Sequence, residues 1–135
     1  MEKRTYEEAV DITVNWWIDK SFKTPLNQNN GDNSETGGTV FMLMNFLSMS
    51  VQEKVTDEHI DKFRVELTRL LLEAKGKSRY STELSVDYDP SALLYQACQV
   101  ANVPTQCLPI KTFTFINAEN EVEGRYQYGG KWFKI

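Results

Sequence analysis

The chain has 135 residues, a mass of 15.6 kDa and a formal net charge of −4. This length predicts a single domain over residues 1–135, which is large enough to bury a hydrophobic core without disulfides or metals. The acidic balance, with a sequence pI near 5.0, argues against a generic nucleic-acid binder, because such proteins gain their affinity from many phosphate contacts.

Cysteine usage and hydropathy disfavour two further classes of protein, secreted disulfide-bonded proteins and membrane proteins. Cys98 and Cys107 are the only cysteines, and the sequence shows neither a CxxC spacing nor a secretory signal ahead of them. We therefore expect reduced thiols and a cytoplasmic location. The longest apolar run, residues 40–49, is interrupted by Asn45 and Ser48 and is far too short to span a bilayer, so no membrane contact is expected.

The first predicted helix runs from Thr5 to about Lys20. Thr5 and Glu8 match a capping box, in which a hydroxyl and a carboxylate bind free backbone N–H groups at the helix start. An apolar stripe at helical spacing predicts a face that packs in the core. The stripe consists of Tyr6, Val10, Val14 and Trp17, widened by Ala9 and Trp16. We expect both tryptophans in the core or at an interface, with stacking on a ligand as the alternative.

Residues 27–38 contain no apolar side chain, which predicts a flexible polar surface loop. A loop of this length either serves as a lid or partner contact, or is a plain tether. The next segment, residues 40–49, is apolar around most of a helix and predicts burial on more than one side. It is therefore either the contact of a homodimer or higher homo-oligomer, or a central core helix.

A third helix is predicted from Thr56 to about Lys75. Its start has a capping residue and two acids, and Gly76 marks its end. Its apolar face consists of Ile60, Phe63, Leu67, Leu70 and Leu71. The basic cluster that follows, residues 75–79, includes Arg79, which we consider as an anion contact; the alternative is a solvated helix end that complements the negative dipole terminus.

A short strand and a fourth helix come next. Leu84, Val86 and Tyr88 alternate to one side of the strand. Asp89 and Pro90 predict the N-cap and first turn of the helix. The core-facing stripe of this helix is Leu93, Leu94, Ala97 and Val100, and its end is marked by Asn102 and Pro104.

The last 25 residues predict a three-stranded antiparallel meander. Residues 111–116 and 121–128 alternate in character, and Gly129-Gly130 favours a two-residue hairpin turn. With the helices, this predicts an α+β fold of about four helices packed on a small antiparallel sheet.

The meander gathers aromatic and basic side chains that suit a planar ring with an attached anion. The candidate ligand-binding residues there are Lys111, Arg125, Tyr126, Tyr128 and Trp132. For each aromatic, ordinary cross-strand packing is the alternative. Strict alternation separates Arg125 from the tyrosines, so a shared pocket needs a bulge near Gly124, a sheet edge or a subunit boundary.

The sequence offers no catalytic or metal-binding pattern. The single histidine, His59, stands in the first turn of a predicted helix, where it is more often a capping neighbour than a base. One histidine and two distant cysteines match no zinc spacing. We expect no catalytic residue, metal or cofactor.

The order of elements, with DYDPSALLYQACQVANVP at residues 87–104 and KTFTFI at 111–116, resembles small proteins encoded by phages and mobile elements of Gram-positive bacteria. Among these it is similar to the Thoeris anti-defence sponges. The resemblance implies an oligomeric, non-enzymatic protein that sequesters cyclic ADP-ribose-type signals in the host cytoplasm. It carries no residue-by-residue assignment.

We therefore expect a binding protein for an anionic, nucleotide-type small molecule. The competing hypothesis is a protein-interaction module or inhibitor that blocks a host factor through the meander or the polar loop. A closed pocket that combines Arg125 with an aromatic favours the first hypothesis, and a flat exposed aromatic face favours the second.

Overall fold

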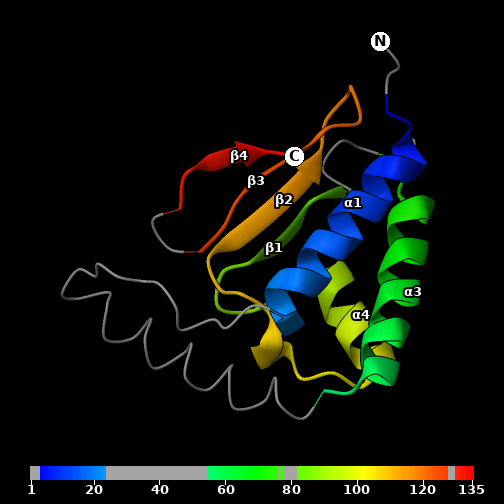
Figure 1. Cartoon of the computed structure of the whole chain (residues 1–135), viewed down its shortest axis with the longest axis vertical. Coiled ribbons are helices and arrows are strands. Elements are labelled where there is room, and N and C mark those ends of the chain that lie inside the picture. The colour runs from blue at the N-terminus through cyan, green and yellow to red at the C-terminus, as the bar shows by residue number, and fades with distance from the viewer. Residues whose placement is uncertain (1–3, 24–54, 76, 78–81, 128–129) are drawn as a thin grey trace, which may run out of the picture.

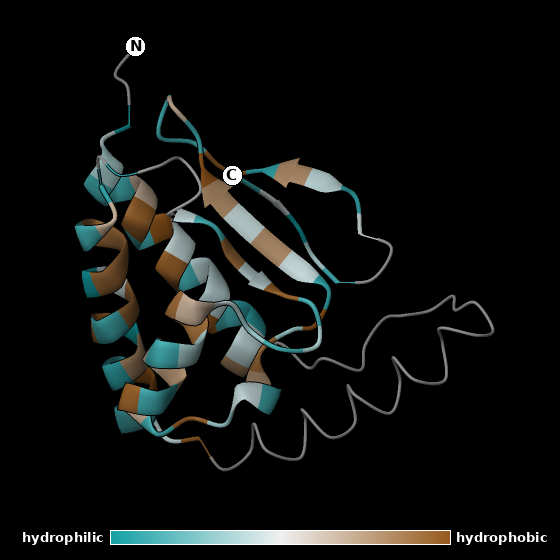
Figure 2. Cartoon of the chain, turned by 180° about the vertical axis from the view of Figure 1, so that it is seen from behind, coloured by the Kyte–Doolittle hydropathy of each residue, from teal (hydrophilic) through white to brown (hydrophobic). Residues whose placement is uncertain are grey.

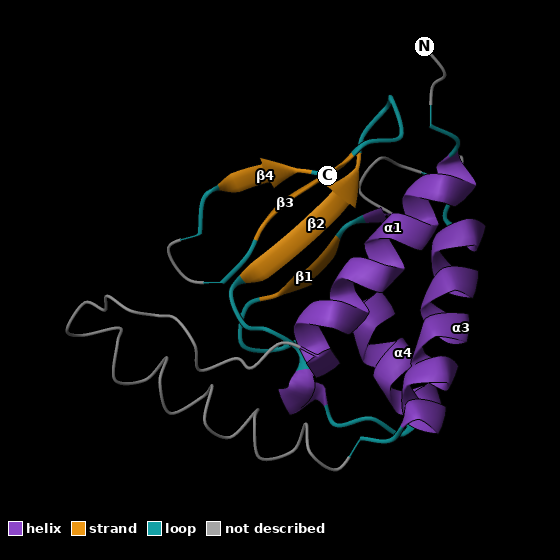
Figure 3. Cartoon of the chain, viewed as in Figure 1, coloured by secondary structure: helices purple, strands orange, loops and turns teal. Residues whose placement is uncertain are grey.

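The computed structural model describes residues 4–23, 55–75, 77, 82–127 and 130–135. Within these ranges the chain forms a layer of helices against a sheet (Figure 1, Figure 3). The elements in order are α1 (Tyr6–Ile18), the π-helical turn η1 (Asp19–Lys23), α3 (Asp57–Glu73), β1 (Leu84–Val86), α4 (Ala92–Ala101), the 3-10 turn η3 (Thr105–Cys107), β2 (Thr112–Ile116), β3 (Val122–Arg125) and β4 (Trp132–Lys134).

The α+β class is confirmed, with a small correction to the helix count. The described residues contain three α-helices and a four-stranded antiparallel sheet, against a prediction of about four helices. The helix predicted at residues 40–49 and the polar loop at 27–38 lie outside the described residues. No helix in the described part of the chain is both long and apolar enough to cross a membrane.

Local capping chemistry starts α1 and α3 as predicted. At α1, Thr5 Oγ1 accepts from the Glu8 N–H at 3.1 Å, and Glu8 Oε1 accepts from the Thr5 N–H at 2.8 Å. At α3, Thr56 Oγ1 accepts from the His59 N–H, and His59 Nδ1 accepts from the Thr56 N–H, both at 3.2 Å. These bonds satisfy N–H groups that the helix itself leaves free. The single histidine thus caps a helix.

The predicted start of α4 at Asp89 and Pro90 is wrong by two residues. Ser91 is the N-cap, while Pro90 forms a bridge to Val86 at the end of β1. Two bonds between Ser91 and Ser85 hold this turn: the Ser85 N–H donates to Ser91 Oγ, and the Ser91 N–H donates to the Ser85 carbonyl. Pairing with β1 therefore delays the helix. Its end at Asn102, in the left-handed conformation with φ of 60°, agrees with the prediction.

The C-terminal meander is confirmed, and β1 extends it to four strands in the order β1-β2-β3-β4. Gly124 pairs directly with Thr114 and Phe133, so β3 has no bulge there. The predicted two-residue turn at Gly129-Gly130 lies partly outside the described residues, and the β3–β4 ladder ends at the pair of Arg125 and Trp132. Thr112 Oγ1 accepts the Gln127 N–H at 2.9 Å, which draws the chain out of the ladder after Arg125.

The core lies between the helices and one face of the sheet. Its largest fully buried side chains come from all the α-helices of the described part and from the sheet: Trp17, Phe63, Ile18, Leu67, Leu71, Leu84, Leu94, Leu108, Val10, Val14 and Val122. Strand β2 turns Thr112, Thr114 and Ile116 toward this core, as its buried positions show. Its two phenylalanines therefore face the other way, and Figure 2 shows the resulting alternation of hydropathy along β2.

Candidate functional site

The face of the sheet turned away from the helices, here called the outer face, carries the candidate site. Cross-strand pairing places Ser85, Phe113, Arg125 and Trp132 in one row across all four strands. Directly paired residues project to the same side of a sheet. The helix-facing side is identified by Thr114, which lies next to Phe113 and accepts a hydrogen bond from the α1 residue Trp17.

Trp132 forms the exposed aromatic part of this face. The indole ring centroid lies 5.5 Å from that of Phe113 and 5.9 Å from that of Phe115. Its Nε1 donates to Glu123 Oε1 at 2.9 Å, and Asn117 Nδ2 donates to the other Glu123 oxygen at 2.6 Å. Hydrogen bonds from Asn117 and then Trp132 lower the pKa of Glu123, so the carboxylate stays charged and orients the indole. The Trp132 side chain remains 51% exposed and presents an aromatic surface.

A groove of about 500 Å³ opens beside Phe113 where β1 and β3 end and β2 begins. Its lining includes Lys111 and Arg125, both predicted as ligand contacts, and also Asp87, Glu83 and Gln127. Arg125 Nε donates to the Gly130 carbonyl at 3.2 Å, and among the described residues the guanidinium forms no ion pair. Its remaining N–H groups can therefore bind a ligand oxygen.

Lys111 is held more firmly than Arg125. Its ammonium pairs with Asp87 and lies 4.4 Å from the ring centroid of Tyr88. With Glu83 also in the lining, the groove contains two acids and two bases. This balance suits a ligand that carries both an anionic group and hydrogen-bond donors such as hydroxyls, rather than a polyanion.

Tyr126 lies on the helix side, as the alternation argument predicts. Its ring centroid is 5.7 Å from that of Trp16, and the Lys20 ammonium lies 4.9 Å from the Tyr126 ring centroid. Burial, with a smaller contribution from the charge of Asp19, raises the pKa of Tyr126 to about 12. Trp16 also packs against Phe133, with ring centroids 5.2 Å apart. Tyr126 therefore belongs to a packing cluster and does not line the groove.

The structure brings together three of the six predicted site residues: Lys111, Arg125 and Trp132. Tyr126 packs elsewhere, while Arg79 and Tyr128 lie outside the described residues. Sequence reasoning missed the acids of the groove and Gln127. Asp87 lies within the strand predicted from Leu84, Val86 and Tyr88, on the side opposite to these residues, and that position was available as a signal.

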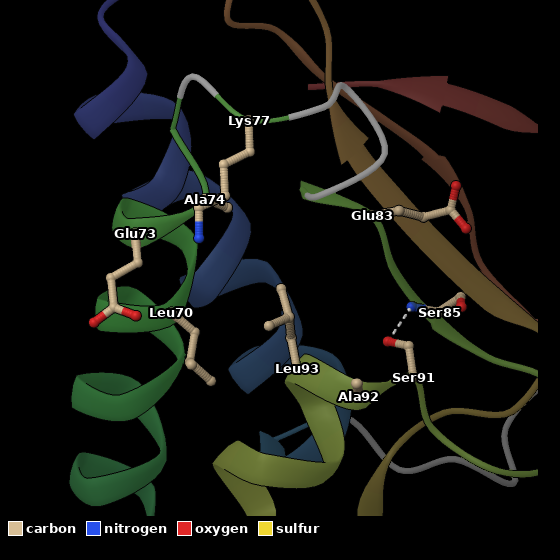
Figure 4. Close-up of a pocket in the computed structure, with 9 residues that line it drawn as sticks. All are labelled: Leu70, Glu73, Ala74, Lys77, Glu83, Ser85, Ser91, Ala92 and Leu93. Carbon is tan, nitrogen blue, oxygen red and sulfur yellow. Dashed lines mark hydrogen bonds between the residues drawn. The ribbon is translucent and has the colours of Figure 1, made fainter.

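A second groove of about 440 Å³ lies between the C-terminal end of α3, the start of α4 and β1 (Figure 4). Leu70 and Leu93 form its apolar walls, and Lys77, Glu73 and Glu83 stand around it. It shares Glu83 and Ser85 with the first groove. Among the described residues its lining has no aromatic side chain that could stack a planar ring as the outer face can.

The thiols do not offer a nucleophile at neutral pH. Cys98 and Cys107 are free and buried, and burial raises the pKa of each to about 12. The reactive form of cysteine is the thiolate, which such a pKa suppresses. Within the described ranges, no group of three or more histidine, cysteine or acidic side chains is arranged to hold a metal ion.

No protein-family model matches the chain, and no curated protein matches it at a significant level.

Proposed function

We propose that this chain is a non-enzymatic binding protein that sequesters an anionic, nucleotide-type small molecule on the outer face of its sheet, in the manner of a phage anti-defence sponge. The observation that supports this proposal best is the row in which Arg125 is paired with Phe113 on one side and Trp132 on the other. A guanidinium that forms no ion pair with any described residue, next to partly exposed rings, combines the two groups that a nucleotide needs.

The proposed pose follows from these contacts. The planar ring of the ligand lies on Phe113 and Trp132, whose ring centroids are 5.5 Å apart. The phosphate accepts hydrogen bonds from the Arg125 guanidinium, and Lys111 adds positive charge from the same groove. Glu83 and Asp87 accept hydrogen bonds from ligand hydroxyls. Stacking is worth about 1–3 kcal/mol per base, and a charge-assisted hydrogen bond about 1.5–3 kcal/mol.

The test is calorimetric titration of nucleoside phosphates, ADP-ribose derivatives and cyclic dinucleotides against the wild type, Arg125→Ala and Arg125→Lys. We expect Arg125→Ala to lose about 2 kcal/mol or more of binding free energy, because a charge-assisted bidentate pair disappears. Arg125→Lys restores the positive charge but not the planar, bidentate guanidinium, so it should recover only part of the lost binding free energy. Since Arg125 is exposed, its loss should leave the melting temperature nearly unchanged.

Lys134→Ala is a matched control, since Lys134 lies on β4 and is paired with Glu121, away from the groove. It should bind like the wild type. The proposal fails if no compound binds more tightly than ~100 μM, or if one does and both Arg125 variants match the wild type. Recovery of the bound compound intact after denaturation checks that the protein binds without turnover.

The exposed aromatic face also supports a second candidate, a protein-interaction module that blocks a host factor. Trp132 is 51% exposed beside Phe113 and Phe115, and tryptophan is enriched at the energetic centres of protein interfaces. Native mass spectrometry of the protein from cell lysate separates the two candidates. A retained small molecule of nucleotide mass favours the first, and a stoichiometric protein complex that Trp132→Ala abolishes favours the second.

A further inference from the structure

Gln127 is a buried polar side chain whose Nε2 atom has no hydrogen-bond partner among the described residues. The residue is only 9% exposed and lines the groove of the outer face. The Nε2 atom is covered and has no acceptor in the described part of the chain. A buried donor left without an acceptor costs about 1–3 kcal/mol, so such a group calls for an explanation.

The main-chain N–H and carbonyl groups of Gln127 are both hydrogen-bonded. Thr112 Oγ1 accepts the Gln127 N–H at 2.9 Å and donates to the Ile110 carbonyl at 3.1 Å. The Gln127 carbonyl accepts the Gly130 N–H at 3.0 Å. These bonds fix the main chain of the residue and leave the side-chain amide for another acceptor.

The backbone at this groove is also unusual. Four non-glycine residues of the described chain have positive φ. Asn102 and Asn120 are asparagines, which tolerate this region well. The other two, Lys111 at 56° and Gln127 at 63°, both line the groove. Such conformations cost free energy and persist where the surrounding structure holds a functional group in place.

We infer that Gln127 is a specificity-determining residue of the groove, whose side-chain amide donates a hydrogen bond to an acceptor atom on the planar ring of the ligand, a ring nitrogen or a carbonyl oxygen. This inference rests on the proposed function, because it directs one edge of the ring that lies on Phe113 into the groove that Phe113 and Gln127 both line. Since Nε2 is covered, the side chain must turn toward the groove on binding, and the terminal amide torsion of glutamine is soft. The groove then distinguishes a nucleotide from a sugar phosphate.

The test compares two probes: ribose 5-phosphate, and whichever of the four common nucleoside 5′-monophosphates binds the wild type most tightly. The variant is Gln127→Met, which keeps the length of the side chain and removes its polar group. We expect the preference for the nucleotide over ribose 5-phosphate to fall about tenfold, while the affinity for ribose 5-phosphate stays the same. The melting temperature without ligand should not fall, because an unpartnered buried amide is replaced by an apolar group.

Two controls identify which step fails. Gln99→Met makes the same substitution at an exposed site on α4 and should change nothing in binding. Arg125→Ala should weaken both probes alike. If none of the monophosphates binds the wild type, the proposed function and this inference fall together. A second outcome is that the monophosphates bind and depend on Arg125, but Gln127→Met keeps the full preference for the nucleotide. A third is that Gln127→Met weakens both probes equally and lowers the melting temperature. In either case the inference alone is wrong and Gln127 is structural.

Discussion

The hydrogen bond between Trp17 and Thr114 is the clearest link between the helix layer and the sheet, and its strength can be worked from the structure. Trp17 Nε1 donates to Thr114 Oγ1 at 2.8 Å, and both residues are fully buried. The bond positions β2, whose opposite face carries Phe113 at the groove. We propose to remove it from either side with Trp17→Phe, Thr114→Val and the double variant.

The expected magnitudes differ between the three variants. Thr114→Val preserves shape but leaves a buried indole N–H without an acceptor, which should cost about 1–3 kcal/mol. Trp17→Phe should cost more, because it also leaves a cavity in the core. In the double variant both partners are gone and no group is left unpaired. The double variant should therefore be about 1–2 kcal/mol more stable than the sum of the two single losses predicts.

Urea unfolding followed by circular dichroism measures these free energies, with the slope of the transition checked for constancy. Trp16→Phe combined with Thr114→Val is a matched control, since Trp16 makes ring contacts while the hydrogen bond to Thr114 comes from Trp17. That pair should be additive within about 0.5 kcal/mol. If the unfolding free-energy changes of Trp17→Phe and Thr114→Val add as closely as those of the control pair, this bond does not couple the two layers.

Four further predictions follow from other parts of the chain. Gly124→Ala should cost more than about 3 kcal/mol or prevent folding, because an added Cβ would lie 2.1 Å from the Phe113 carbonyl oxygen; urea unfolding decides this. Iodoacetamide at pH 8 should label Cys98 and Cys107 only after unfolding, as read by mass spectrometry. Stability should fall as the pH rises from 9 toward 12, because the unfolded chain releases thiol protons that the folded chain, with both pKa values raised to about 12, still holds. The apolar segment 40–49 predicts a homo-oligomer, so light scattering should give a multiple of 15.6 kDa that Met44→Asp reduces, and a wild-type monomer would contradict it.

Local chemistry in the sequence determined much of the secondary structure. Thr5 and Thr56 start their helices because a side-chain oxygen there satisfies N–H groups of the first turn, an effect confined to three or four residues. The positive φ of Asn102 ends α4 for an equally local reason. Alternation over residues 111–125 was enough to predict antiparallel strands and to separate Arg125 from Tyr126.

Only the tertiary structure decided which face of the sheet is buried and where the candidate site lies. In β2 hydropathy alone would bury the phenylalanines, yet the threonines face the core, because Trp17 and the Gln127 main chain supply partners for their hydroxyls. The same long-range bond to Gln127 lies just beyond the end of the β3–β4 ladder and brings the amide of Gln127 to the groove beside Arg125. Residues far apart in the chain make these contacts, so no local pattern encodes them.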